Sequence, residues 1–134
     1  MTSALAVSES FRLFVLDQLE DLGDVVPRSM FGGVGLYRQD LFFGILAGDV
    51  LYLKVDDETR GACEAAGSSP FRPYGDRAGT MQYYSVPVSV LESPPELTRW
   101  ARRALGAAAR AADAKSGRGK RLRAARPSPR GRSR

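Results

Sequence analysis

The chain has 134 residues, a net charge of +5, one cysteine and no histidine. This length is that of a single domain, and the missing histidine excludes Ser/His/Asp and Cys/His catalysis as well as zinc sites built from cysteine and histidine. One cysteine permits no internal disulfide, which is typical of a cytoplasmic protein. No apolar run approaches the roughly 18 residues that a membrane span requires, and the first residues lack the basic leading region of a signal peptide.

The charge is divided unequally along the chain. Residues 1–97 contain 7 Lys/Arg and 14 Asp/Glu, a net of −7, whereas residues 98–134 contain 13 Lys/Arg and 1 Asp/Glu, a net of +12. Such an asymmetry concerns partners and solubility more than fold. The sequence therefore predicts an acidic body followed by a strongly basic segment.

The first predicted element is an amphipathic helix over residues 8–22, preceded by a flexible N-terminus over residues 1–7. Gly23 is placed to end this helix in a left-handed turn, and Pro27 prevents its continuation. The apolar side chains recur at helical spacing and are Phe11, Phe14, Val15, Leu19 and Leu22.

An antiparallel meander follows the helix. Three strands are predicted over residues 29–37, 41–46 and 50–55, and short polar turns at residues 38–40 and 47–49 connect them. Apolar and polar side chains alternate in the third strand, which indicates a sheet covered by helices on one side only.

Two smaller elements are predicted next. Asp56 and Asp57 can cap a short helix that reaches Ala66 and stops at Gly67. A further strand over residues 80–86 is predicted, and it can pair with residues 71–74.

The last predicted element is a helix that begins at Ser93, with Pro94 at its first position and Glu96 three residues after the serine, as in a capping box. An apolar stripe on this helix is predicted to pack on the sheet, with Trp100 as an anchor and the arginines outward. The stripe consists of Leu97, Trp100, Ala101, Ala104, Leu105 and Ala108.

The composition changes after Asp113. Residues 114–134 contain nine Lys/Arg, no acid and one large apolar side chain, Leu122, so they bury too little surface to offset the entropy of ordering. We therefore predict a two-layer α+β domain over residues 8–112, with helices packed on one face of an antiparallel sheet, and a disordered basic C-terminal tail over residues 113–134.

Several separated sequence blocks occur in the order seen in a known family. These blocks are MFGGVGLY, FFGI, LYLKVD, PF and MQYYSVP, followed by the helix that carries Trp100. Together they resemble the TfoX (Sxy) N-terminal domain, a family associated with the regulation of bacterial competence genes. The resemblance implies a homodimeric, non-enzymatic regulatory or interaction module in transcription, and it brings no catalytic residue, metal or cofactor to this chain.

The basic segment is the strongest candidate site in the sequence. Flexible Lys and Arg without acids bind polyanions through phosphate contacts, without reading the base sequence. The alternatives are a solvated extension, or contact with an acidic protein, a membrane or the protein's own acidic body. The predicted nucleic-acid-binding residues are Arg99, Arg102, Arg103, Arg110, Lys115, Arg118, Lys120, Arg121, Arg123 and Arg126.

Other residue groups suggest weaker alternatives. The glycines of FGGVG lack the spacing of phosphate-binding loops and favour a bend or a bulge in a strand, but a small-molecule or enzymatic pocket that gathers Arg28, Tyr37 or Lys54 beside them is the alternative function. Cys63 is predicted to be a small buried core residue. A set of aromatic residues could stack on bases, with Lys54 and Arg38 supplying the positive charge. Packing in the core or at a dimer interface is favoured for this set. It consists of Tyr37, Phe42, Phe43, Tyr52, Tyr74, Tyr83 and Tyr84. Turn and cap roles are favoured over a magnesium site for the carboxylates Asp49, Asp56, Asp57 and Glu58.

Overall fold

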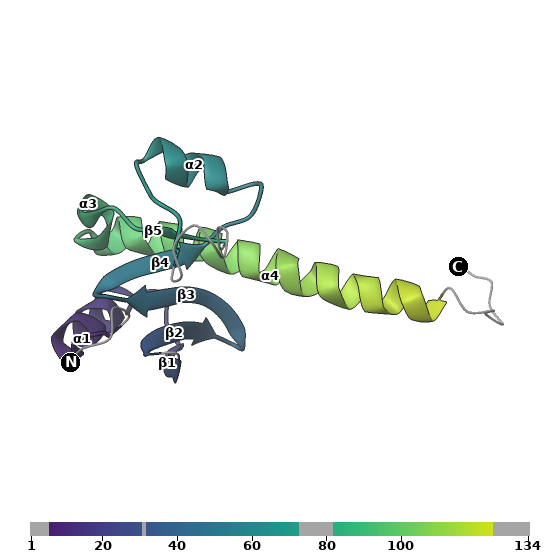
Figure 1. The fold of residues 1–134 in the computed structure, drawn as a ribbon, viewed down its shortest axis with the longest axis horizontal. Coiled ribbons are helices and arrows are strands. Elements are labelled where there is room, and N and C mark those ends of the chain that lie inside the picture. The colour runs from purple at the N-terminus through teal and green to yellow at the C-terminus, as the bar shows by residue number, and fades with distance from the viewer. Residues whose placement is uncertain (1–5, 31, 73–81, 125–134) are drawn as a thin grey trace.

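The structure, a computed structural model, describes residues 6–30, 32–72 and 82–124, with side chains described as far as Lys115. Within these residues, five antiparallel strands form one sheet in the order β1-β2-β3-β4-β5, and four helices accompany it, as Figure 1 illustrates. The elements are α1 (Glu9–Gln18), β1 (Val25–Met30), β2 (Gly33–Arg38), β3 (Leu41–Ala47), β4 (Val50–Lys54), α2 (Arg60–Ala65), β5 (Tyr83–Ser85), α3 (Val88–Leu91) and α4 (Pro94–Ala124). Residues 1–5 of the predicted flexible N-terminus lie outside the described residues.

The first helix is shorter than predicted. Ser8 caps α1 by accepting a hydrogen bond from the backbone N–H of Phe11, and the helix ends at Gln18 instead of residue 22 because turns follow it up to Gly23, whose φ is +78°. Phe14 was predicted to face the core, but its side chain is 39% exposed.

The predicted strand over residues 29–37 is confirmed for residues 33–37 only, because the chain reverses between Met30 and Gly33. β1 ends at Met30 and β2 begins at Gly33, with Gly32 between them at a φ of +85°. β1 lies at the edge of the sheet, where Pro27 costs no ladder hydrogen bond. The chain therefore enters the sheet one strand earlier than predicted.

The two turns of the predicted meander are confirmed. Gln39 and Asp40 join β2 to β3, and Gly48 and Asp49 join β3 to β4, with φ between 51° and 67° at all four residues. Two-residue turns with positive φ at both positions match the twist of antiparallel strands.

A bulge in β3 shapes the covered face of the sheet. Leu36 pairs with Gly44 and the next residue, Tyr37, pairs with Phe42, so Phe43 is the extra residue. A side chain at Gly44 would meet Leu36, Leu53 and the backbone oxygen of Tyr52, each at 3.3 Å. Gly44 thus has no room for a side chain, and the neighbouring extra residue, Phe43, is fully buried.

The last strand is shorter than predicted. β5 covers three residues and pairs with β4, while residues 80 and 81 of the predicted strand lie outside the described residues. The backbone N–H of Phe71 donates to Tyr83 over 2.8 Å, and Ser85 donates to Ser69 over 2.8 Å. The predicted pairing of this segment with the strand is confirmed for Phe71, and its end, residues 73 and 74, is not described.

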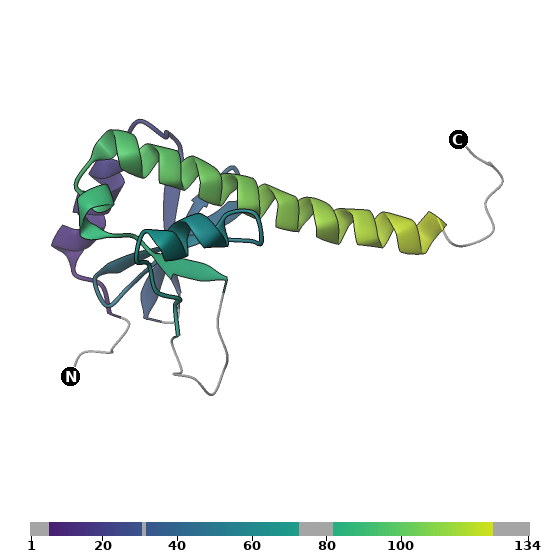
Figure 2. The ribbon, with the colours of Figure 1, turned by 90° about the horizontal axis from the view of Figure 1, so that it is seen from above.

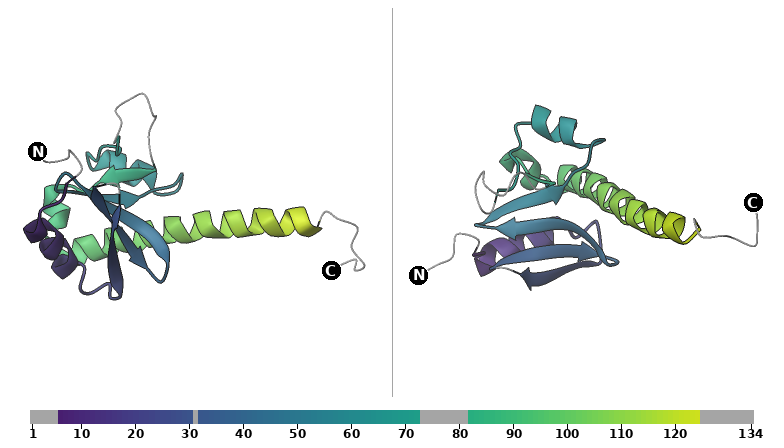
Figure 3. Two further views of the ribbon diagram at one scale, coloured as in Figure 1. Left: turned by 60° about the horizontal axis from the view of Figure 1, so that its bottom comes forward. Right: turned by 45° about the vertical axis from the view of Figure 1, so that its right-hand side comes forward.

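The helices pack on one face of the sheet, as predicted. Figures 2 and 3 show α1 and α4 on the same side of the strands, and Gln18 of α1 donates a side-chain hydrogen bond to the backbone of Leu91 in α3. The main core joins the two layers and includes Val15, Leu19, Leu36, Phe43, Leu46, Leu51, Leu53, Leu97, Ala101 and Ala104.

The last helix extends further than predicted. It begins at the predicted position, where the N–H of Leu97 donates to the backbone oxygen of Ser93, but it continues past residue 112 to Ala124. Eight of the twelve residues 113–124 are Ala, Leu, Lys or Arg, which are strong helix formers. Residues 113–124 of the predicted disordered tail are therefore helical in this structure, and residues 125–134 lie outside the described residues.

Candidate functional site

The predicted nucleic-acid-binding residues all belong to α4 except Arg126, which lies outside the described residues. Beyond Asp113 the helix carries Lys115, which is exposed, and then Arg118, Lys120, Arg121 and Arg123. We call residues 114–124 the α4 extension. Figure 1 shows it projecting beyond the sheet, so five cations and no acid lie on a helical segment away from the domain.

The four arginines nearer the domain have different surroundings. Arg99 pairs with Glu96 one turn earlier, and Arg102 is exposed. The guanidinium of Arg103 is half-buried and lies 4.7 Å from the centre of the Trp100 ring. The sequence predicted that these arginines all face outward. The structure contradicts this prediction, because their surroundings differ.

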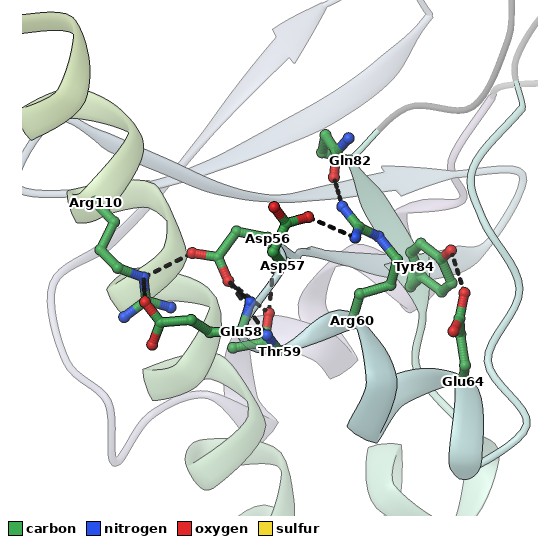
Figure 4. Close-up of polar contacts among 9 residues, drawn as sticks. All are labelled: Asp56, Asp57, Glu58, Thr59, Arg60, Glu64, Gln82, Tyr84 and Arg110. Atoms are coloured by element: carbon green, nitrogen blue, oxygen red, sulfur yellow. Dashed lines mark hydrogen bonds and ion pairs between the residues drawn. The ribbon is translucent and has the colours of Figure 1, made fainter.

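Arg110 binds the protein's own acidic residues. Its Nε lies 2.6 Å from Oδ2 of Asp56 and 3.2 Å from Oε2 of Glu58, across the junction between β4 and α2 (Figure 4). The hydrogen bond from Arg110 lowers the pKa of Asp56, and hydrogen bonds from the backbone N–H groups of Glu58 and Thr59 act in the same direction. Arg110 thus anchors α4 to the domain.

The remaining predicted carboxylates also have partners. Arg60 lies between Asp57, at 2.8 Å, and the side chain of Gln82 (Figure 4), and Asp49 accepts a hydrogen bond from the backbone N–H of Ser8. Ion pairs and turn hydrogen bonds therefore account for these groups. The prediction that Asp56 and Asp57 cap the short helix is wrong for α2 itself, because its N-cap is Thr59, which makes no side-chain capping hydrogen bond. In the part of the chain that the structure describes, three or more metal-ligating side chains do not gather at any point.

The aromatic set is divided between the two faces of the sheet. Phe43 and Tyr84 belong to clusters on the helix-covered face, and Tyr74 lies outside the described residues. On the other face, Tyr37 stacks on Phe42 at 4.9 Å and Phe42 contacts Tyr83 at 5.4 Å.

Two cations lie at the ends of this aromatic row. Arg28 lies 5.0 Å from the Tyr37 ring, and Lys54 lies 5.1 Å from the Tyr83 ring. Burial lowers the pKa of Lys54 and raises the pKa of Tyr83. Arg38, the other cation predicted beside the aromatic set, binds the end of the α1 region instead. Its Nε donates to the backbone oxygens of Leu22 and Gly23.

The structure brings two residues of the alternative pocket, Arg28 and Tyr37, together, but Lys54 lies beside Tyr83 at the other end of the aromatic row. A side chain at Gly35 would lie 2.6 Å from Cε of Met30 and 3.1 Å from Phe42. The space over Gly35 is thus filled by the protein's own side chains.

Trp100 joins the two layers, as predicted. It packs against a small cluster formed by Val55 of the sheet region, Cys63 of α2 and Tyr84 of β5. Cys63 is 5% exposed, which confirms its core position, and burial raises the pKa of its thiol. Tyr84 donates a hydrogen bond to Glu64 over 2.8 Å (Figure 4), so α2 is fixed against the sheet.

Two features of this region were missed from the sequence. The spacing of Trp100 and Arg103, three residues apart on a helix, was a signal for their contact. The pairing of Arg110 with Asp56 had no such signal, because 54 residues separate them.

In the described part of the chain, no helix combines the length and the apolar character needed to cross a membrane.

Comparisons with known proteins agree with the fold. A search of curated proteins found no match. The family model of the TfoX N-terminal domain matches residues 17–108, a range that includes every described strand but only the last two residues of α1. The chain therefore belongs to the TfoX N-terminal domain family.

Proposed function

We propose that this protein is a non-enzymatic interaction module in which the α4 extension holds nucleic acid without reading its sequence. The observation that supports this most is the continuous helix from Pro94 to Ala124, which carries five Lys/Arg and no acid after Asp113. Cations that neutralise phosphates release condensed counterions, which supplies sequence-independent affinity.

The position of the α4 extension answers the main objection to this function. Residues 1–97 carry a net charge of −7, and an acidic body repels nucleic acid. At 1.5 Å per residue, residues 114–124 span about 16 Å, which exceeds the Debye length of about 8 Å at physiological salt. Most of the cations of the α4 extension are therefore screened from the body.

The family membership suggests the biological context. We propose a cytoplasmic protein that acts in transcription, in keeping with the association of this family with competence genes, and that forms a homodimer. The folded body would contact protein while the α4 extension holds nucleic acid. Sedimentation equilibrium of the full chain tests the dimer, and a monomer at all concentrations would contradict it.

A binding measurement with charge-matched variants tests the nucleic-acid role. Fluorescence anisotropy of a labelled DNA duplex of arbitrary sequence should give a dissociation constant of about 10⁻⁴ to 10⁻⁶ M at physiological salt. Replacing all nine Lys/Arg of residues 114–134 by Gln should weaken binding by at least roughly a hundredfold, because most phosphate contacts are lost.

The matched control keeps the charge. In a second variant, every Arg of residues 114–134 becomes Lys, which preserves each positive charge but not the planar guanidinium. Non-specific binding should then change by less than roughly fivefold. Equal binding by the Gln variant and the natural chain would rule the proposal out.

A further inference from the structure

The outer side of the first turns of α4 contains a small basic recess. It has a volume of about 360 Å³ and is lined by Glu96, Arg99, Trp100, Arg102 and Arg103. Three arginines and one carboxylate give it a net positive charge, although the domain around it is acidic. We call these five residues the Trp100 recess.

Arg103 has unused hydrogen-bonding capacity in this recess. Its guanidinium lies 4.7 Å from the Trp100 ring centre, and its Nη2 is shielded from solvent without a hydrogen-bond partner among the described residues. A guanidinium has five N–H donors and no acceptor. Such a group lacks a hydrogen-bond acceptor, and an oxyanion is the acceptor that a cationic guanidinium binds most strongly.

The two neighbouring arginines complete a set of donors. Arg102 is exposed, and nothing in the described part of the chain forms an ion pair with it. Arg99 shares the recess with Glu96, to which it is paired. One carboxylate therefore balances only one of the three arginines.

Trp100 makes the recess rigid on its inner side. Its ring packs against Val55, Cys63 and Tyr84, and the ring in turn holds the guanidinium of Arg103. A planar guanidinium held in place loses little freedom when it binds an oxyanion through two parallel hydrogen bonds.

We propose that the Trp100 recess binds a phosphate group, and that in the cell this group is a phosphodiester of the nucleic acid held by the α4 extension. The second part of the proposal rests on the proposed function. Twenty residues of helix, about 30 Å, separate Trp100 from Lys120. This length corresponds to about nine base pairs at 3.4 Å each, so one duplex can contact both places.

The only tryptophan of the chain lies in the recess, so tryptophan emission, excited at wavelengths that tyrosine does not absorb, reports on this site alone. Inorganic phosphate, added to the full chain, should produce a saturable change in Trp100 emission. Sodium chloride of the same ionic strength is the blank, and acetate tests whether a carboxylate serves equally well. Arg102→Gln should weaken phosphate binding by at least roughly tenfold, the usual loss for a charge-assisted hydrogen bond, and Arg103→Gln should abolish it.

Further variants separate this inference from the proposed function. The variant with nine Gln in residues 114–134 should lose DNA affinity but keep the phosphate response of Trp100. Arg102 is exposed, so Arg102→Gln should leave the fold and the unliganded emission unchanged, even if Arg103→Gln destabilises α4. The inference is overturned if phosphate changes the emission no more than chloride, if acetate acts equally, or if Arg102→Gln responds like the natural chain.

Discussion

Nε of Arg110 lies 2.6 Å from Oδ2 of Asp56 and joins the middle of α4 to the turn that follows β4. The same carboxylate accepts hydrogen bonds from the backbone N–H groups of Glu58 and Thr59 through Oδ1. One side chain therefore holds both the turn before α2 and the helix that carries the basic segment.

Asp56→Ala should lower the free energy of unfolding by about 1–2 kcal/mol, since it removes the acceptor of two turn hydrogen bonds and an ion-pair partner together. Urea unfolding measures the loss. The neighbouring substitution Asp57→Ala is the control, because the side chain of Asp57 is 99% exposed and exposed ion pairs contribute at most about 1 kcal/mol. Equal losses in the two variants would show that the contacts of Asp56 are not special.

The contribution of Asp56 should depend on pH. The hydrogen bond from Arg110 lowers the pKa of Asp56 in the folded protein below its ordinary value of 3.8. The charged carboxylate therefore stabilises the fold fully above the ordinary pKa, and this stability is lost as the pH falls through the lowered value. The difference in unfolding free energy between the natural chain and Asp56→Asn should be constant near neutral pH and shrink below about pH 4. A difference that persists unchanged into strong acid would contradict this assignment.

Two glycine substitutions should change stability in opposite directions. A Cβ at Gly44 would be 3.3 Å from Leu36, Leu53 and a backbone oxygen, so Gly44→Ala should destabilise the protein by about 1–3 kcal/mol through overpacking. A Cβ at Gly61, within α2, would meet nothing within 4 Å. Gly61→Ala should therefore stabilise the protein by about 0.5–1 kcal/mol through helix propensity. Thermal unfolding of both variants checks the two signs, and destabilisation by Gly61→Ala would show that α2 differs from this description.

The helicity of the α4 extension should be limiting for its function. Helices without tertiary packing are marginal in water, and Gly117 and Gly119 each disfavour the helix by about 1 kcal/mol. Changing both to Ala should raise the far-ultraviolet helical signal of the free protein and tighten DNA binding. Gly106→Ala, in the packed part of α4 where a Cβ makes only ordinary contacts, should do neither. A higher helical signal with unchanged DNA affinity would show that the helix is unimportant for binding.

The sequence predicted the elements whose signals are local. The turns at Gln39 and Asp40 and at Gly48 and Asp49 were predicted because polar or small residues interrupt apolar runs, and Ser93 and Pro94 marked the start of α4. The β1–β2 hairpin was missed because Pro27 and the glycines weaken the strand pattern on both sides of its turn. The short helix α3 has no periodicity long enough to detect.

The candidate site was predicted in composition but not in arrangement. Its basic residues were identified from charge, yet the end of α4 depends on the balance between helix formers and Gly117 and Gly119, which composition does not resolve. The partner of Arg110 required the tertiary fold. The contact between Arg103 and Trp100 is local, but their helical spacing alone does not predict it, because each side chain has several other possible neighbours.

The salt dependence of DNA binding tests the central claim most directly. The logarithm of the binding constant falls linearly with the logarithm of salt concentration, with a slope of about −0.9 for each phosphate neutralised on duplex DNA. The full chain should give a slope of about −3 or steeper, and the variant with nine Gln in residues 114–134 should give a slope near that of the domain's few remaining contacts, about −1 to 0. A shallow slope for the full chain, or equal slopes for the two proteins, would contradict the account.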